Sequence, residues 1–175
     1  MKIKEVIATI NQMQADGVME QYAVGGAVGA TFYLEPVATL DVDIFVGCRP
    51  EPGRLIANSK HIYDYLLARG CKTEGEHIVI AGWPVQFLPP TGPLTQEALA
   101  QAVTINIEDT PACVFTAEHL AAIALQTGRA KDKARLLQFI EAEVLDAKRF
   151  ESILTRHGLL DRWQEFERQF PQESS

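Results

Sequence analysis

The feature that most constrains this chain is an apolar run that stops abruptly at two glycines. The run "YAV" ends in Gly25-Gly26, and the next apolar run, "LDVDIFVG", carries Asp41 and Asp43 at its head. Glycine permits a sharp turn from a strand into a helix, and the small residues of "AVGATFYLE" suit a helix packed closely on a sheet. We therefore expect a strand, a glycine turn, a helix closed by Pro36, and a second strand.

Hydrophobic spacing predicts the remaining elements. It predicts an opening helix that ends at Gly17 and a second helix within 54–70. "EHIVIAGWPVQFLPP" is typical of two short strands joined at Ala81-Gly82, and "VTINIED" and "TPACVF" of one or two later strands. A short helix, "TQEALAQA", lies between these strand regions. From Thr116, which suits a helix N-cap, the pattern is helical to the end.

These elements predict the α/β (α+β) class, with a mixed sheet flanked by helices. The strands fall within residues 1–115, and residues 116–175 form a C-terminal helical subdomain. No stretch rich in Pro, Gly or Ser separates the two parts. We therefore expect the helical tail to pack on the sheet.

Composition excludes several classes of protein. A net charge of −7 argues against a broad nucleic-acid-binding face, and no apolar run is long enough to span a bilayer. The first residues have helical spacing instead of a continuous signal core, so we expect a cytoplasmic protein. Cys48, Cys71 and Cys113 are odd in number and widely spaced, which favours buried free thiols over disulfides or a zinc site.

Alternation along a strand places Asp41 and Asp43 on the same face, with Cα atoms about 6.5–7 Å apart. Two carboxylates at this spacing suit Mg²⁺ or Mn²⁺, which often complete their shells with phosphate oxygens and water. The Gly25-Gly26 turn offers backbone N–H groups to a phosphate. Together the two motifs predict a site for a nucleoside triphosphate. The alternative is that the acids merely face water and the glycines merely form a tight turn.

The order of these motifs resembles that of the nucleotidyltransferase superfamily related to DNA polymerase beta. In that family a glycine pair precedes a helix and then a strand with Asp-x-Asp. "YLEPVATLDVDIFV" is most similar to bacterial stand-alone nucleotidyltransferases, including toxin components of abortive-infection systems. Pro36, Ala38 and Thr39 match their common pattern, whereas Val37 replaces an arginine.

A second match lies in the tail, where "LAAIALQTGRAKDKARLLQFIE" resembles a helical segment of the same group through Gly128, Arg129, Lys131 and Asp132. The resemblance covers about residues 22–141. It implies a nucleotidyltransferase-type sheet on which Asp41 and Asp43 hold the metal ion. The phosphate-binding residues that it implies are Gly25, Gly26, Thr39, Arg129 and Lys131.

The implied reaction transfers a nucleoside monophosphate from a nucleoside triphosphate (NTP) to an acceptor, which is RNA, protein or a small molecule. An antitoxin is the implied protein partner. Departures from the family favour an alternative, a degenerate member that binds nucleotide or a partner without chemistry. The family's third carboxylate falls at Gln86, which as a metal ligand brings no charge, and a common lysine falls at Ala124. Glu74 or Glu76 would replace that carboxylate only if the strand register differs.

Interpretations without a catalytic role remain open for several of these residues. Arg129, Lys131, Lys133 and Arg135 suit a solvated helix face on which Asp132 pairs with Arg135. His77 and His119 are expected to be structural, and Trp83 and Phe87 to belong to the core, although they also suit a base or acceptor pocket. Without the resemblance, the chain is an interaction module with a helical tail.

Overall fold

The computed structural model describes residues 3–36, 38, 41–47 and 59–172. Its seven strands form one mixed sheet in the order β3-β4-β5-β2-β1-β7-β6. β1 (Gln21–Val24) and β2 (Val42–Gly47) are antiparallel neighbours at the centre. β2 pairs with β5 (Trp83–Leu88) and β1 with β7 (Thr110–Val114), both in parallel.

The outer strands are antiparallel. β4 (His77–Ile80) joins β5 through the predicted turn, in which Ala81 and Gly82 have φ of 51° and 83°. Positive φ at both central residues is the geometry that a two-residue hairpin favours. β3 (Lys72–Glu74) and β6 (Val103–Ile107) form the two edges. β3 was not predicted, because its three residues are all exposed and carry no hydrophobic alternation.

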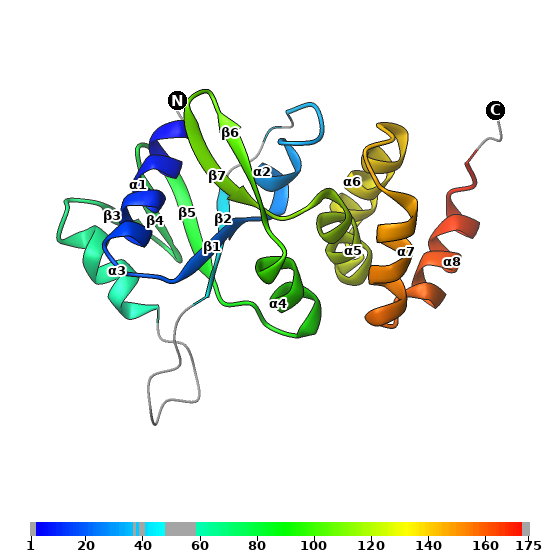
Figure 1. Ribbon diagram of the computed structural model, residues 1–175. Coiled ribbons are helices and arrows are strands. Elements are labelled where there is room, and N and C mark those ends of the chain that lie inside the picture. The colour runs from blue at the N-terminus through cyan, green and yellow to red at the C-terminus, as the bar shows by residue number, and fades with distance from the viewer. Residues whose placement is uncertain (1–2, 37, 39–40, 48–58, 173–175) are drawn as a thin grey trace.

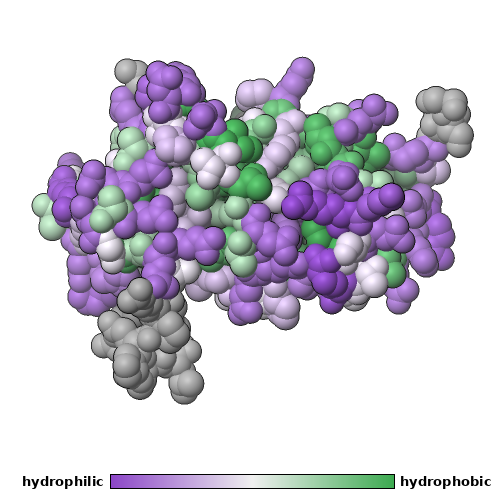
Figure 2. All heavy atoms as spheres, in the orientation of Figure 1, coloured by the Kyte–Doolittle hydropathy of each residue, from purple (hydrophilic) through white to green (hydrophobic). Residues whose placement is uncertain are grey.

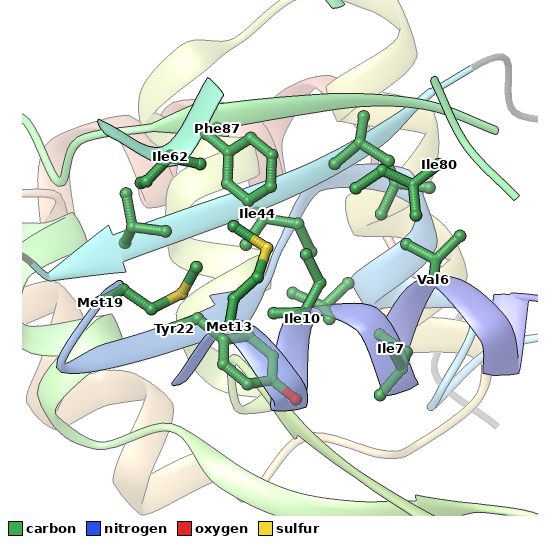
Figure 3. Packing of buried hydrophobic residues seen from close by; sticks show 14 of the residues in the cluster. Val6, Ile7, Ile10, Met13, Met19, Tyr22, Ile44, Ile62, Ile80 and Phe87 are labelled. Atoms are coloured by element: carbon green, nitrogen blue, oxygen red, sulfur yellow. The ribbon is translucent and has the colours of Figure 1, made fainter. Parts of the chain in front are cut away.

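One face of the sheet is covered by α1 (Ile3–Ala15) and α3 (Lys60–Leu67), as Figure 1 shows. Of the apolar stripe predicted for α1, Val6, Ile7, Ile10 and Met13 are buried and Ile3 is partly buried. Figure 3 shows Ile10 and Met13 packed toward Ile44 of β2 and Phe87 of β5. Phe87 therefore belongs to the core, where its ring also meets Tyr63 edge-on at 6.0 Å. Leu55 and Ile56, predicted for the helix before Gly70, lie outside the described residues.

The opposite face carries α2 (Gly26–Ala30), α4 (Pro93–Ala100) and the helical tail. The tail consists of α5 (Ala117–Thr127), α6 (Ala130–Glu141), α7 (Ala147–Arg156) and α8 (Leu160–Gln169). Figure 1 shows these four helices side by side at one end of the molecule. Residues of the tail and of the sheet share one hydrophobic core, which includes Ala23, Phe115, Leu120 and Phe139. The division into a domain of residues 1–115 and a C-terminal helical subdomain packed on it stays a prediction.

Two predicted helices are shorter than expected. α2 ends at Ala30, well before Pro36, because the chain turns there and the Tyr33 hydroxyl donates to the carbonyl of Phe115 at 2.8 Å. The helical stretch after residue 129 divides in two where Glu143 adopts a φ of 53° and Asp146 caps α7. The Thr116 cap of α5 is confirmed, since its hydroxyl accepts from the amide of His119.

The surface of the described residues is mostly polar. Figure 2 shows hydrophilic side chains over most of the visible face, with smaller hydrophobic areas between them. Leu67 and Leu160 are the large hydrophobic side chains that are exposed among the residues described. Cys71 and Cys113 are free but half-buried, which corrects the expectation of full burial, and Cys48 lies outside the described part. No described helix has the length and apolar character needed to cross a bilayer.

Candidate active site

The glycine turn lies directly against Asp43. Gly25 continues β1 in an extended conformation, and Gly26 begins α2 with a φ of +57°. A Cβ atom added to Gly26 would lie 2.2 Å from Oδ2 of Asp43, and one added to Gly25 would lie 2.6 Å from the Phe45 ring. Both positions therefore require glycine for steric reasons, and Gly26 also for its backbone conformation. The two predicted motifs meet at one place.

The acidic pair is held at the start of β2. Asp43 belongs to the strand and Asp41 immediately precedes it. Burial, reinforced by the negative charge of Asp41, raises the pKa of Asp43 above its ordinary value, although Lys131, His77 and Arg135 oppose the shift. The Asp41 side chain is 43% exposed, and its Oδ2 atom lies 3.3 Å from Nε2 of His77. The two carboxylates therefore lie close enough for the charge of Asp41 to act on Asp43, and their joint role stays a prediction.

Gln86 is the neighbour of Asp43 on β5, as the strand register shows. Residues paired across parallel strands project from the same face of a sheet. The antiparallel pairing of Ile78 with Val85 extends the row, because His77 then falls opposite Gln86. A neutral amide thus occupies the place beside Asp43 where the family resemblance implies a third carboxylate.

Glu74 and Glu76 do not replace that carboxylate. Glu74 lies on the edge strand β3, where it pairs with His77 of β4. This edge strand is two strands beyond Gln86, so Glu74 lies roughly 14 Å from Asp43. Glu76 is exposed in the turn between β3 and β4. The strand register pairs Asp43 with Gln86, so Gln86 is the residue next to the acidic pair.

The tail brings positive charge to Asp43 from the start of α6. Lys131 and Arg135 act on the carboxyl of Asp43. The pKa of Arg129 is raised chiefly by its hydrogen bond to Asp132, and the charge of Asp43 adds the smallest contribution. Asp132 is buried and accepts from Nε of Arg129 at 2.6 Å, with Nη1 of Arg135 at 3.8 Å. The expected Asp132–Arg135 pair is present, but the same carboxylate binds Arg129 more closely. The charges of Lys131 and Arg135 therefore act on Asp43, and Asp132 pairs with Arg129 and Arg135 at the start of α6.

Four further positions named from the sequence do not contribute a described contact to this site. Thr39, expected near the phosphates, and Val37, which replaces an arginine, lie outside the described residues. Ala124, at the place of a common lysine, is buried in the core of the tail. Trp83 is partly buried against the core under α1 and α3. Its indole N–H is buried without a hydrogen-bond partner in the described structure.

The donor atoms suit a hard cation that shares its shell with a ligand. Two carboxylates and one amide oxygen are the oxygen donors that Mg²⁺ and Mn²⁺ accept. Burial and the charge of Asp41 raise the pKa of Asp43, and a bound cation would favour its ionised form. Within the described residues, no three His, Cys, Asp or Glu side chains are arranged to hold a metal ion by themselves. The set fits a cation whose remaining ligands are phosphate oxygens and water.

Sequence reasoning missed two residues of this site. Arg135 was interpreted as part of a solvated face, although its i+4 spacing from Lys131 places both on one side of α6. His77 was expected to be structural. It reaches Asp41 only because β4 and β5 pair as they do, and that pairing leaves no signal in the local sequence.

Comparison with solved structures identifies proteins that share this fold. No protein-family model matches the sequence, and no curated protein matches it. The structure is similar to that of an antigenic nucleotidyltransferase-like protein from Paracoccidioides brasiliensis. The TM-score is 0.59 at 14% identity, over 94% of this chain and 91% of that one.

Two structures of ANT(2″)-Ia are also similar. The crystal structure in complex with adenylyl-2″-tobramycin has a TM-score of 0.56 at 13% identity, over 93% of this chain and 99% of that one. The solution structure of this antibiotic-resistance factor has a TM-score of 0.54 at 13% identity and covers 95% of both chains. The chain therefore has the nucleotidyltransferase fold, as the sequence predicted.

Proposed function

We propose that this protein binds a nucleoside triphosphate together with Mg²⁺ or Mn²⁺ and transfers the nucleoside monophosphate to an acceptor. The observation that carries the proposal is the contact between the Gly25-Gly26 turn and the carboxylate of Asp43. A turn that can bind phosphate, lying next to a carboxylate that can bind a cation, suits a ligand whose phosphate groups carry a metal ion.

Each residue of the site has a role in this proposal. Asp41 and Asp43 hold the cation, and Gln86 offers a neutral oxygen beside them. The cation supplies charge neutralisation on the attacking and leaving oxygens of the transfer. Arg129, Lys131 and Arg135 counter the negative charge of the phosphates, and Asp132 holds both guanidinium groups in place.

The acceptor is RNA, protein or a small molecule. One structure similar to this chain was solved with adenylyl-2″-tobramycin, which supports testing small molecules first. The toxin role, the antitoxin partner and the cytoplasmic location stay predictions from the sequence.

A second candidate function is nucleotide binding without transfer, and the position of Gln86 favours it. A carboxylate at this place would help to deprotonate the attacking group, whereas an amide does not accept a proton at neutral pH. In that case the protein senses or stores nucleotide and the cation only tightens binding.

Calorimetric titration with each of the four NTPs, with and without Mg²⁺, tests the shared part of both candidates. We expect binding that needs Mg²⁺ and that weakens by at least about 100-fold in Asp43→Asn, since loss of a metal ligand exceeds the 10–100-fold effect of losing an outer partner. Asp109→Asn, an exposed acid in the turn between β6 and β7, is the matched control and should bind normally. Absence of Mg²⁺-dependent binding contradicts both candidates and leaves the interaction module.

Transfer of label from α-³²P-labelled NTPs to total RNA, to a protein extract or to an aminoglycoside mixture separates the two candidates. Label on any acceptor, lost in Asp43→Asn, supports the transferase. Tight Mg²⁺-dependent binding with no pyrophosphate release in any mixture supports binding alone.

A further inference from the structure

A second group of charged side chains lies where α4, α5 and α7 meet, away from Asp43. Glu97 of α4 accepts from Arg156 of α7 through Oε1, at 3.0 Å from Nε and 2.5 Å from Nη2. Its other oxygen, Oε2, accepts from Nε2 of His157, the residue that caps the C-terminus of α7. A single carboxylate thus ties the end of α7 to a helix that packs on the central strands.

His119 of α5 lies beside the same carboxylate but makes no bond to it. Its side chain is fully buried, and Nδ1 pairs with the Thr116 hydroxyl at 2.7 Å. The other ring nitrogen, Nε2, is buried without a hydrogen-bond partner and lies 3.8 Å from Oε2 of Glu97. Oε2 of Glu97 therefore lies near two imidazole rings and is hydrogen-bonded to that of His157.

The fixed charges around His119 are balanced while its ring is neutral. Glu97 from α4 and Glu118 from its own helix face Arg149 and Arg156 from α7, and His157 completes the group. Glu118 is already engaged, because its Oε1 accepts from the amide of Asp146 at 2.9 Å. A proton on His119 adds positive charge beside the two guanidinium groups of α7, and both nearby carboxylates already have partners.

We propose that Glu97 and His119 form an acid-sensitive latch between the sheet domain and the end of the tail. When His119 takes up a proton, its Nε2–H competes with His157 for Oε2 of Glu97, and the added charge repels α7. The end of α7 and the neighbouring α8 then separate from α4, while the sheet stays folded.

The direction of the pH effect follows from burial. Burial lowers the pKa of His119, and the charge of Glu97 opposes this shift only in part. A buried neutral imidazole favours the closed state above the ordinary histidine pKa of about 6.5. Below that pH the ratio of loosened to closed molecules rises by up to about tenfold per pH unit.

Trp163 of α8 reports directly on this end of the tail. Its ring meets Phe150 of α7 edge-on at 5.1 Å and stacks on Phe166 at 5.7 Å. The chain has two tryptophans, so Trp83→Phe leaves Trp163 as the single reporter. Between pH 7.5 and 5.5 we expect its emission to shift to longer wavelength while the far-UV circular dichroism is retained. An emission that does not shift, or one that shifts only together with loss of circular dichroism, contradicts the latch.

His119→Asn in the same background keeps a polar group near Thr116 and removes the titrating ring, so the shift in this pH range should disappear. His61→Asn is the matched control. His61 lies on α3, on the other face of the sheet, and contacts the carbonyl of Val18. The shift should persist in this control, and equal behaviour of the two variants contradicts the proposal.

An NMR titration of the His119 ring in the unsubstituted chain gives an answer even if His119→Asn does not fold. Its midpoint should lie below the ordinary histidine range and fall further in Glu97→Gln. A midpoint at or above about 6.5 overturns the latch.

Discussion

Asp43 and Glu97 are both largely buried carboxylates on the tail side of the sheet, yet their surroundings shift their pKa values in opposite directions. Burial and the adjacent Asp41 raise the pKa of Asp43. Burial alone would also raise the pKa of Glu97, but hydrogen bonds from His157 and Arg156 outweigh it and lower the pKa. The difference indicates that Glu97 is satisfied within the protein, whereas the charge of Asp43 is only partly compensated by Lys131, His77 and Arg135.

This contrast separates a binding site from a structural contact. A carboxylate that is costly to ionise in the free protein gains most from a cation that arrives from outside. A carboxylate that already accepts three hydrogen bonds from α7 has little to gain from a ligand. The direction of the pKa shift therefore distinguishes Glu97, which is paired within the protein, from Asp43, which we propose holds a cation.

The largest expected effect on stability is that of Glu97→Gln. It removes the anion to which Arg156 and the largely buried His157 bind, and we expect the free energy of unfolding to fall by about 2 kcal/mol at pH 7.5. Urea unfolding followed by circular dichroism measures this loss. Glu151→Gln, an exposed acid on α7, is the control and should change stability by less than about 0.5 kcal/mol. Equal results for the two variants would mean that Glu97 is not the tie between α4 and α7.

The next effect concerns the contact of Gly26 with Asp43. Gly26→Ala and Gly75→Ala place a methyl group at nearly the same backbone angle, φ +57° and +60°, but only Gly26 has a neighbour within 4 Å of the added atom. We expect Gly75→Ala to cost about 1 kcal/mol from backbone strain and Gly26→Ala about 0.5 kcal/mol more, because the Asp43 carboxylate must shift. The comparison of the two urea midpoints measures the difference. Equal costs would show that the Asp43 carboxylate does not lie against the turn.

Gln86→Asp adds a third carboxylate beside those of Asp41 and Asp43. We expect affinity for Mg²⁺, titrated alone by calorimetry, to increase by about tenfold, because a third charged ligand joins the pair. Stability without metal should fall at the same time, because like charges lie side by side. Gln172→Asp, near the C-terminal end of the described chain, is the control for added charge. No gain over this control would mean that the cation does not bind along this row.

The smallest effect is a gain in stability, by up to about 1 kcal/mol, for Asp43→Asn in the absence of metal and nucleotide. The raised pKa of Asp43 means that its ionised form is disfavoured in the folded state at pH 7.5. The advantage of asparagine should shrink as the pH falls through that pKa, because the protonated acid is also neutral. Urea midpoints at pH 7.5 and pH 5 test this. A loss of stability at pH 7.5 would place Asp43 with Glu97 among the satisfied carboxylates.

Much of the candidate site was predictable because its motifs are local. Two glycines after an apolar strand and two acids two residues apart indicate chemistry from their spacing alone. Gln86 was identified through the family resemblance, which implies a third carboxylate on a later strand, and the parallel pairing of β5 with β2 then places it beside Asp43. His77 was not, because nothing near it in the chain indicates which strand its neighbour joins. The unpredicted strand β3 was missed for a related reason, as its exposed residues have no pattern.

The amino-acid sequence by itself determined the order of strands and helices, the glycine turn, the acidic pair and the helical character of the tail. These follow from side-chain spacing and from the conformational freedom of glycine, which act over a few residues. Tertiary structure decided which charges meet: Arg135 faces Asp43, His77 reaches Asp41, and Glu97 joins α4 to α7. Such contacts depend on strand register and helix packing, where distant segments bury a common surface, and that information is spread over the whole chain.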